Sequence, residues 1–292
     1  MIFKTGIVVG VAHNFVEVRI MQIVYRCLIK GNLKVKTNKI LVGDLVSVNF
    51  IDQEYPIVEA ILPRTNELYR PSIANVDQVL IVTSLVSPSL SSFLLNKLLT
   101  IFNFYHLDII LVFTKMDLVD KTHEVWTKIT AYQTLNLKTV FISNVTQSGI
   151  DELKQLFANK LSLLTGTSGV GKSSTLNNLN RDLKLWTQTI SSSLNRGKHT
   201  TTKTRLYFLF DGIIADTPGF SVYQLQGLTN IDIATNFPSF NNIWQNCKFR
   251  TCLHQQEPQC AIKIAVSNKD IDAFFYEDYC KILAEFNKNN YK

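Results

Sequence analysis

The feature that most constrains this chain is the octapeptide at 166–173, Gly-Thr-Ser-Gly-Val-Gly-Lys-Ser, which fits G-x-x-x-x-G-K-[ST] at every fixed position. A strand-like apolar segment precedes it, and a helical pattern begins at Lys172. Glycines in such a turn let successive backbone N–H groups point at one phosphate group at the start of a helix. We therefore expect a phosphate-binding loop, with Lys172 at the β- and γ-phosphates and the Ser173 hydroxyl on Mg²⁺. A glycine-rich turn without a ligand is the structural alternative.

The region from about residue 67 to residue 225 alternates strand-like and helical patterns. Strands are expected at 78–85, 108–114, 138–143, 160–165, 205–210 and 212–216. Helical patterns lie between several of them, at about 89–105, 121–134, 150–159 and 172–180. The alternation predicts an α/β domain built on a doubly wound sheet with helices on both faces.

Different patterns flank this region on both sides. Five short strand-like segments come first, at 6–12, 15–20, 23–29, 45–51 and 57–62, and they predict a small closed barrel of the OB type. After Pro238 the strand signal stops, and a Cys/His-rich loop leads into a helical pattern at about 269–287. We expect three domains: an RNA-binding barrel at 1–65, the α/β domain at 66–225 and a metal-binding helical domain at 226–292.

Composition excludes several classes of protein. With 46% hydrophobic and 18% charged residues, the chain is too apolar and too weakly charged to be disordered. Five cysteines are too few for a disulfide scaffold, which favours a reducing compartment. The longest apolar runs, such as 109–113, are too short to span a membrane. We expect a cytoplasmic protein that does not bind a membrane and is a monomer.

The net charge of +7 is unevenly distributed. Residues 26–39 contain five basic residues and no acid, and the stretch between Asp182 and Asp211 contains another five and no acid. Such segments indicate a polyanionic partner such as nucleic acid, although ordinary solvated loops explain the charge equally well.

Two further segments follow expected strands at the edge where doubly wound sheets bind ligands. Thr114-Lys115-Met116-Asp117 offers a carboxylate that can accept the N1–H and N2 amino protons of guanine, a pair that adenine lacks, while the Lys115 stem covers the purine. Ser143-Asn144 can add backbone N–H groups toward the guanine O6.

A third segment, Asp216-Thr-Pro-Gly219, also ends a strand. There Asp216 would hold Mg²⁺ through water and the Gly219 N–H would reach the γ-phosphate. The residues expected to contact the nucleotide or its metal ion are therefore Thr114, Lys115, Met116, Asp117, Ser143, Asn144, Gly166, Thr167, Ser168, Gly169, Val170, Gly171, Lys172, Ser173, Ser174, Asp216 and Gly219.

The Cys/His-rich loop contains three thiols and one imidazole within fourteen residues, at Cys247, Cys252, His254 and Cys260. Structural zinc takes four such ligands in a closed tetrahedron, so we expect one Zn²⁺ here. The alternative is three core cysteines and a surface histidine. The other two cysteines, Cys27 and Cys280, fall in strand and helix patterns and are expected in the core.

These motifs are those of a GTPase in an unusual order, because the base-reading segments precede the phosphate loop. With the barrel, the Cys/His loop and the segments Val42-Gly43-Asp44 and Leu62-Pro63-Arg64, the whole chain resembles the RsgA/YjeQ family of circularly permuted GTPases. The resemblance implies a cytoplasmic bacterial enzyme that binds GTP and GDP with Mg²⁺ and hydrolyses GTP. It also implies binding to the small (30S) ribosomal subunit and its 16S-type rRNA late in maturation.

Hydrolysis needs a residue that orients water, and many GTPases use a Gln after D-x-x-G. Here that residue is Phe220, and the family too has a hydrophobic residue there. We therefore expect His199 to be catalytic, together with Lys172 and with Thr201, which would close on Mg²⁺; an RNA-facing His199 is the alternative. We expect 183–203 to become ordered only against RNA, which predicts slow intrinsic turnover and strong stimulation by the small subunit.

Three positions depart from the family pattern. Asn144 replaces the usual alanine, which we expect to loosen guanine packing while leaving the backbone donor. Thr114 stands where many GTPases have Asn, and the segment 27–31 lacks the arginine usually found before its glycine.

The same motifs argue against two other functions. A P-loop ATPase or small-molecule kinase is disfavoured by the guanine-reading segment 114–117. An RNA-binding module with a purely structural nucleotide is disfavoured by intact Lys172, Ser173 and Asp216.

Overall fold

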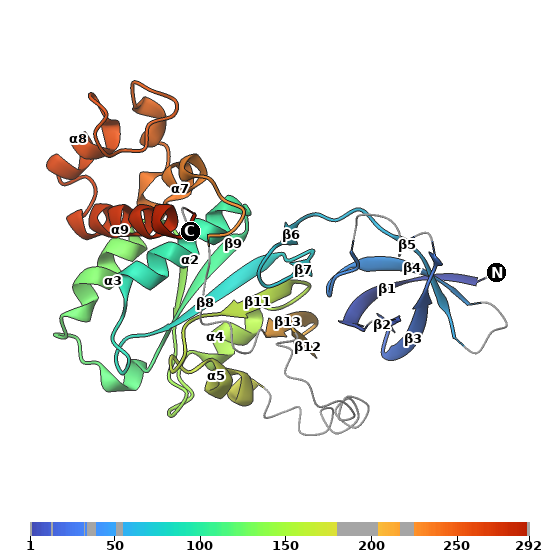
Figure 1. The fold of residues 1–292 in the computed structure, drawn as a ribbon. Helices are drawn as coiled ribbons and strands as arrows, with labels where there is room; N and C mark the ends of the chain where they lie inside the picture. The colour runs from blue at the N-terminus through green and yellow to red at the C-terminus, as the bar shows by residue number, and fades with distance from the viewer. Residues whose placement is uncertain are drawn as a thin grey trace. The chain divides into compact units, whose positions relative to one another are not determined.

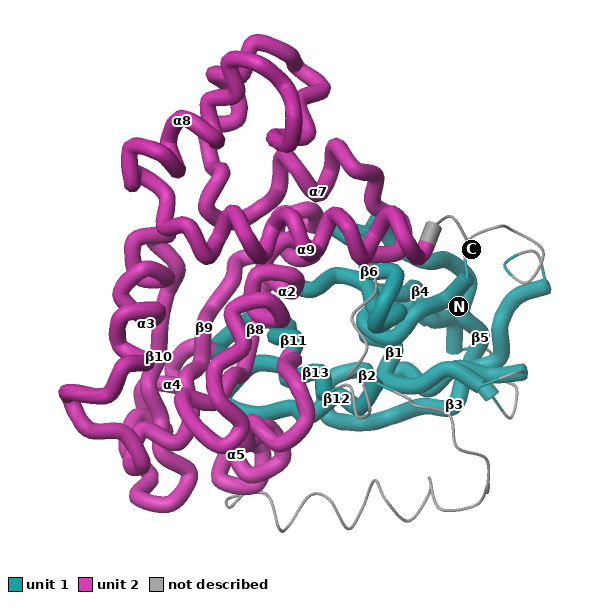
Figure 2. Tube along the Cα trace, turned by 60° about the vertical axis from the view of Figure 1, so that its left-hand side comes forward, with its two compact units in different colours: residues 1–77, 157–163, 202–218 teal, residues 78–156, 164–201, 219–292 magenta. Residues whose placement is uncertain are grey.

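The computed structural model describes residues 2–12, 14–31, 33, 39–50, 55–179, 204–216 and 225–290. By contacts the chain divides into two compact units, shown in different colours in Figure 2. The first unit contains 1–77, 157–163 and 202–218, and the second contains 78–156, 164–201 and 219–292.

The five expected N-terminal strands form a closed barrel with the order β1-β2-β3-β5-β4, which confirms that prediction (Figure 1). They are β1 (Ile2–Val11), β2 (Phe15–Ile20), β3 (Ile23–Ile29), β4 (Leu45–Phe50) and β5 (Ile57–Ile61). Alternate residues of β2, namely Val16, Val18 and Ile20, are buried in the barrel core. Strand β1 starts earlier than the apolar pattern predicts because it pairs with β4 from Ile2 onward, where its side chains are exposed and carry no alternation.

A buried ion pair anchors the end of the barrel. The Asp44 carboxylate is fully buried and accepts hydrogen bonds from Arg64 Nε at 2.7 Å and Nη2 at 2.8 Å. It also accepts from the Leu41 N–H at 2.8 Å, while Arg64 Nη2 donates to the Lys39 carbonyl at 2.6 Å. The preceding Gly43 has φ +90°, and a Cβ there would lie 2.2 Å from the Ala74 carbonyl oxygen. These contacts explain the two segments Val42-Gly43-Asp44 and Leu62-Pro63-Arg64.

A six-stranded sheet follows, with the order β10-β9-β8-β11-β13-β12. Its strands are β8 (Gln78–Ser84), β9 (Asp108–Thr114), β10 (Lys138–Phe141), β11 (Leu161–Thr165), β12 (Arg205–Leu209) and β13 (Gly212–Asp216). Its helices are α2 (Ser92–Phe104), α3 (Val125–Gln133), α4 (Ile150–Gln155) and α5 (Lys172–Leu179). Strand β9 pairs in parallel with both β8 and β10. Right-handed crossovers from β8 to β9 to β10 place α2 and α3 on one face, and the return to β11 places α4 on the other. The doubly wound sheet is confirmed.

The edge of this sheet is an antiparallel hairpin of β12 and β13. Its two turn residues, Phe210 and Asp211, both have positive φ, as the tightest hairpins require. Within the first unit the Arg19 guanidinium of β2 lies over the Phe208 ring of β12, 3.5 Å from its centroid. This contact joins the hairpin to the barrel within the first unit.

The C-terminal region is helical, as expected, with one long helix, α9 (Ala273–Asn290), that packs along α2 (Figure 1). Its buried face includes Phe275 and Tyr279. Asn96 of α2 donates to the buried Asp278 carboxylate at 3.0 Å, and Lys97 pairs with Glu285 at 2.6 Å.

Several short elements lack a sequence signal. They are the hairpin of β6 (Glu67–Leu68) and β7 (Ile73–Ala74), the 3-10 turns η1 (Met116–Leu118), η3 (Pro238–Phe240) and η4 (Trp244–Asn246), and the helices α7 (Asn230–Asn236) and α8 (Ala261–Ser267). Elements this short have too few residues to show a period. No helix in the described ranges is both long enough and apolar enough to cross a membrane.

Replacing Arg64 with Ala should destabilise the barrel by about 3 kcal/mol, because it leaves the fully buried Asp44 carboxylate without its cation. Amide hydrogen exchange of β1 and β4 should report this loss as faster local opening. The control is Arg70→Ala, since Arg70 is exposed. Equal exchange in the two variants would contradict the role given to the ion pair.

Candidate functional site

The phosphate loop joins the end of β11 to the start of α5, as its sequence predicts. Its three glycines, Gly166, Gly169 and Gly171, all have positive φ, at 143°, 80° and 99°. A Cβ on Gly166 would lie only 2.1 Å from the Val82 carbonyl oxygen, so that close approach requires glycine. The Lys172 ammonium donates to the carbonyls of Gly166 and Thr167 at 2.6 Å each. These bonds place its positive charge at the loop.

The segment Thr114–Asp117 is bonded directly to the phosphate loop. The buried Thr114 hydroxyl donates to the Val170 carbonyl at 2.6 Å. Lys115 has φ 63°, and its ammonium donates to the Gly169 carbonyl at 3.1 Å and also to the Ser87 carbonyl. Two segments more than fifty residues apart are therefore held together at the carboxyl edge of the sheet.

Asp117 lies in η1 with an exposed side chain, and its carboxylate makes no hydrogen bond or ion pair with any described residue. The backbone beside it is held in place, because the Met116 N–H donates to the Ile142 carbonyl at 3.2 Å. The carboxylate is thus available to a ligand while its backbone is tied to the neighbouring loop.

Hydrogen bonds within the loop after β10 determine which of its backbone N–H groups is left to donate to a purine oxygen. The Ser143 N–H donates to the Ser148 carbonyl at 3.0 Å, and the Ser143 hydroxyl accepts from the N–H groups of Val145 and Thr146 at 3.2 and 3.0 Å. Among the described residues, the backbone N–H of Asn144 has no partner. Asn144 is therefore the residue of this segment whose N–H can serve a base.

The remaining predicted residues divide into three groups. Gly166–Ser174 form the phosphate loop and the first turn of α5, with Ser173 and Ser174 exposed. Asp216 is the last residue of β13, opposite Arg205. Gly219, His199 and Thr201 lie outside the described residues.

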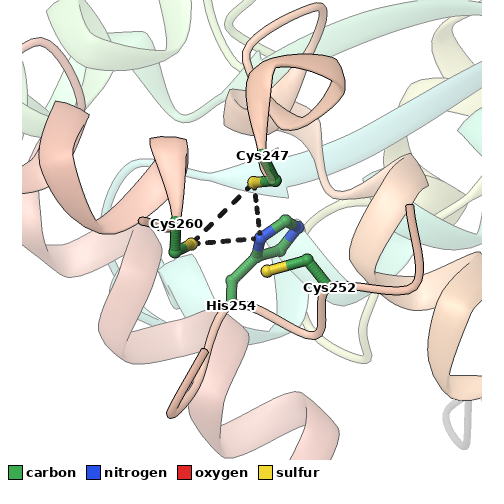
Figure 3. A group of neighbouring side chains, drawn as sticks. All are labelled: Cys247, Cys252, His254 and Cys260. Carbon is green, nitrogen blue, oxygen red and sulfur yellow. Dashed lines mark hydrogen bonds between the residues drawn. The ribbon is translucent and has the colours of Figure 1, made fainter. Parts of the chain in front are cut away.

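The four predicted metal ligands lie together in one cluster (Figure 3). Their ligand atoms are all within 4.8 Å of one another. His254 Nδ1 lies 3.5 Å from Cys247 Sγ and 3.4 Å from Cys260 Sγ, and these two sulfurs are 4.0 Å apart. Tetrahedral zinc with ordinary Zn–S and Zn–N bonds requires about 3.8 Å between sulfurs and about 3.5 Å between sulfur and nitrogen. The cluster fits Zn²⁺, with Nδ1 as the histidine donor atom.

Side chains of α9 and of the loop itself form hydrogen bonds to the loop backbone. Tyr276 donates its hydroxyl to the His254 carbonyl at 2.7 Å, and Tyr279 donates to the Leu253 carbonyl at 2.6 Å. The Glu257 carboxylate accepts from the N–H groups of Leu253 and Gln255 at 2.7 and 2.8 Å. No motif in the sequence marks these three supporting side chains, although the spacing of the tyrosines places both on one face of a helix.

Burial shifts the pKa values of three residues of the cluster toward their uncharged forms. It raises the pKa of the Cys252 thiol to about 12, raises the pKa of the Cys260 thiol and lowers the pKa of His254. Metal binding must therefore release thiol protons, and zinc affinity should fall as the pH is lowered.

The sequence model of the RsgA GTPase family matches residues 61–226, more than half of the chain. The chain belongs to the RsgA GTPase family. The protein named small ribosomal subunit biogenesis GTPase RsgA from Phytoplasma australiense is 43% identical over 252 residues, which cover 85% of this chain and 81% of that one. The protein of the same name from Carboxydothermus hydrogenoformans is 39% identical over 286 residues, covering 96% and 97%.

Solved structures show the same architecture. YjeQ from Thermotoga maritima superposes with a TM-score of 0.83 at 32% identity, covering 98% of this chain and 99% of that one. YloQ, described as a circularly permuted GTPase, gives 0.80 at 28% identity, covering 99% and 96%. The resemblance drawn from the motif order is confirmed, and this RsgA-family chain is a GTPase, a hydrolase acting on GTP.

Membership of the RsgA family implies GTP, GDP and Mg²⁺ as ligands. The described residues that fit them are the phosphate-loop amides, the Lys172 ammonium and the exposed Ser173 hydroxyl. These residues would hold the phosphates and the metal ion, and a bound Mg²⁺ would supply charge neutralisation for hydrolysis of the phosphoanhydride bond.

Replacing Cys252 with Ser should reduce bound zinc from one per chain to less than about 0.2, because the remaining three ligands no longer close a tetrahedron. Metal analysis of protein purified without chelator measures this, and GDP binding by the same sample should be retained. Cys280→Ser is the matched control, since Cys280 lies outside the cluster. Unchanged zinc in the Cys252 variant would show that the metal is bound elsewhere.

Proposed function

We propose that this GTPase binds the small ribosomal subunit through its rRNA, assists its late maturation, and hydrolyses GTP to GDP and phosphate faster on the subunit than alone. The relatives that match nearly the whole chain carry the name small ribosomal subunit biogenesis GTPase. The single observation that carries the enzymatic part is the direct bonding of the guanine-reading segment to the phosphate loop, Thr114 to Val170 and Lys115 to Gly169.

The proposed roles follow this geometry. Lys172 binds the β- and γ-phosphates, Ser173 binds Mg²⁺ and Asp216 holds it through water, and the Asp117 carboxylate accepts the two guanine donors. The Asn144 N–H donates to the guanine O6, because the Ser143 N–H is already bonded within its loop.

The remaining roles fall on residues outside the described ranges. We propose Thr201 as a further Mg²⁺ ligand, the Gly219 N–H as a donor to the γ-phosphate, and His199 as the residue that positions water.

We propose three functional parts, at 1–65, 66–225 and 226–292, with the first and last contacting rRNA. On the barrel surface the Arg26 guanidinium lies over the Phe15 ring, 3.6 Å from its centroid. In the Cys/His-rich loop, the Lys248 ammonium lies over the exposed Phe249 ring, 5.7 Å from its centroid. Paired cations and aromatic rings bind single-stranded nucleic acid through phosphate contacts and base stacking.

We also propose that the protein is a monomer and is located in the cytoplasm.

Replacing Asp117 with Asn should weaken GTP binding about 30-fold or more, because one carboxylate that pairs two base donors contributes on the order of 2–3 kcal/mol. The same variant should gain affinity for xanthosine nucleotides, since xanthine has an acceptor at position 2. Competition binding with GTP and XTP measures both changes, and Asp120→Asn, an exposed acid nearby, is the control. Unchanged GTP affinity in the Asp117 variant would remove Asp117 from the site.

Replacing His199 with Ala should abolish most of the GTP hydrolysis stimulated by small subunits while leaving GTP affinity nearly unchanged. The reason is that Phe220 can neither donate nor accept a hydrogen bond to the attacking water. Phosphate release with and without isolated small subunits, together with subunit co-sedimentation, measures the effect. Stimulated turnover that survives would show that His199 is not catalytic, and loss of co-sedimentation would assign it to RNA contact.

A further inference from the structure

The side chain of Asn144 points away from the base-reading surface and bonds to the helix that begins at the phosphate loop. Its amide Nδ2 donates to the Thr175 hydroxyl at 3.1 Å, and its Oδ1 accepts from Asn178 Nδ2 at 3.1 Å. The same Asn178 amide also donates to the Asn144 backbone carbonyl at 2.9 Å. One side chain from the loop after β10 is thus bonded to two positions on α5.

These bonds form a directed chain that ends on the phosphate loop. The Thr175 hydroxyl, which accepts from Asn144, donates its own proton to the Gly171 carbonyl at 3.0 Å. Thr175 is fully buried, so its hydroxyl depends on protein partners. Gly171 directly precedes Lys172, and a Cβ on Gly171 would lie 3.1 Å from Asn144 Nδ2. The Asn144 amide therefore packs directly on the glycine that leads into the phosphate-binding lysine.

The backbone of Asn144 is held in place as well. Its carbonyl accepts from Gln147 Nε2 at 2.9 Å in addition to Asn178, and its N–H is the free donor of the segment. Fixing both the carbonyl and the side chain sets the direction of that N–H relative to α5. A donor oriented before the ligand arrives binds with less loss of conformational entropy.

We propose that Asn144 is a positioning residue for nucleotide binding: through Thr175 and Asn178 it locks the base-reading loop to the phosphate-loop helix, so that base and phosphates are held at one fixed spacing. This inference rests on the proposed guanine site. It gives the Asn144 side chain a bridging function that alanine, with no amide, cannot perform.

Replacing Asn144 with Ala should raise the Kd for GDP about tenfold, mainly through faster dissociation, as expected for the loss of one or two hydrogen bonds. The Kd for IDP should rise by the same factor, because inosine keeps the O6 that the loop reads and lacks only the 2-amino group. The GDP/IDP affinity ratio is therefore unchanged in this variant, whereas Asp117→Asn must change that ratio. Equilibrium binding and stopped-flow dissociation of the full chain measure these values.

A matched pair on α5 provides the control. Asn178→Ala removes two bonds to Asn144 and should raise the Kd for GDP about threefold or more, while Asn177→Ala, on the exposed face, should leave it unchanged. This pair tests whether the bonds between Asn144 and α5 affect GDP binding even if the Asn144 variant fails to fold. In a double-mutant cycle, Asn144→Ala and Thr175→Val should be non-additive, because both break the same chain of bonds.

The outcomes separate the two proposals. Normal GDP binding by the Asn144 and Asn178 variants, with weakened binding by the Asp117 variant, overturns the bridging function and leaves the site in place. Normal GDP binding by all three overturns the guanine site itself. Fully additive losses in the cycle, or a changed GDP/IDP ratio in the Asn144 variant, also overturn the proposal.

Discussion

The hydrogen bond from the Thr114 hydroxyl to the Val170 carbonyl is the contact on which the site depends. It is buried, so both partners lose more by separating than they would at the surface. It joins the end of β9 to the phosphate loop after β11, and Lys115 adds a second link to Gly169. The spacing of these two loops is therefore set by bonds within the protein itself.

Permutation of the motif order leaves this arrangement intact because strand neighbours, rather than chain order, decide which loops meet. The sheet places β9 beside β8 and β8 beside β11. Loops that leave the carboxyl ends of such strands converge at one edge. The base-reading segments therefore reach the phosphate loop although they precede it in the chain.

The Cys/His-rich loop is held by the same helix that packs along α2. Tyr276 and Tyr279 of α9 bond the loop carbonyls, and Asp278 between them bonds Asn96 of α2. Neighbouring residues of one helix thus serve the metal-binding loop and the α2 contact. A metal ion held by the cluster would close a loop that has few apolar residues of its own, and α9 connects this loop to the rest of its unit.

The sequence by itself determined the barrel strands, the alternation of strands and helices in the sheet, the glycine-rich turn between β11 and α5, and the four residues of the Cys/His cluster, because each depends on local period or on fixed spacing. It could not decide that the Ser143 N–H is taken by Ser148, or that the Asn144 side chain turns to Thr175 and Asn178. The two Asn144 side-chain contacts join residues 31 and 34 positions apart, and only the packing of α5 against the loop after β10 brings them within hydrogen-bond distance. Residues that meet only through tertiary packing leave no repeating pattern in the sequence. Their contacts are therefore known only from the structure.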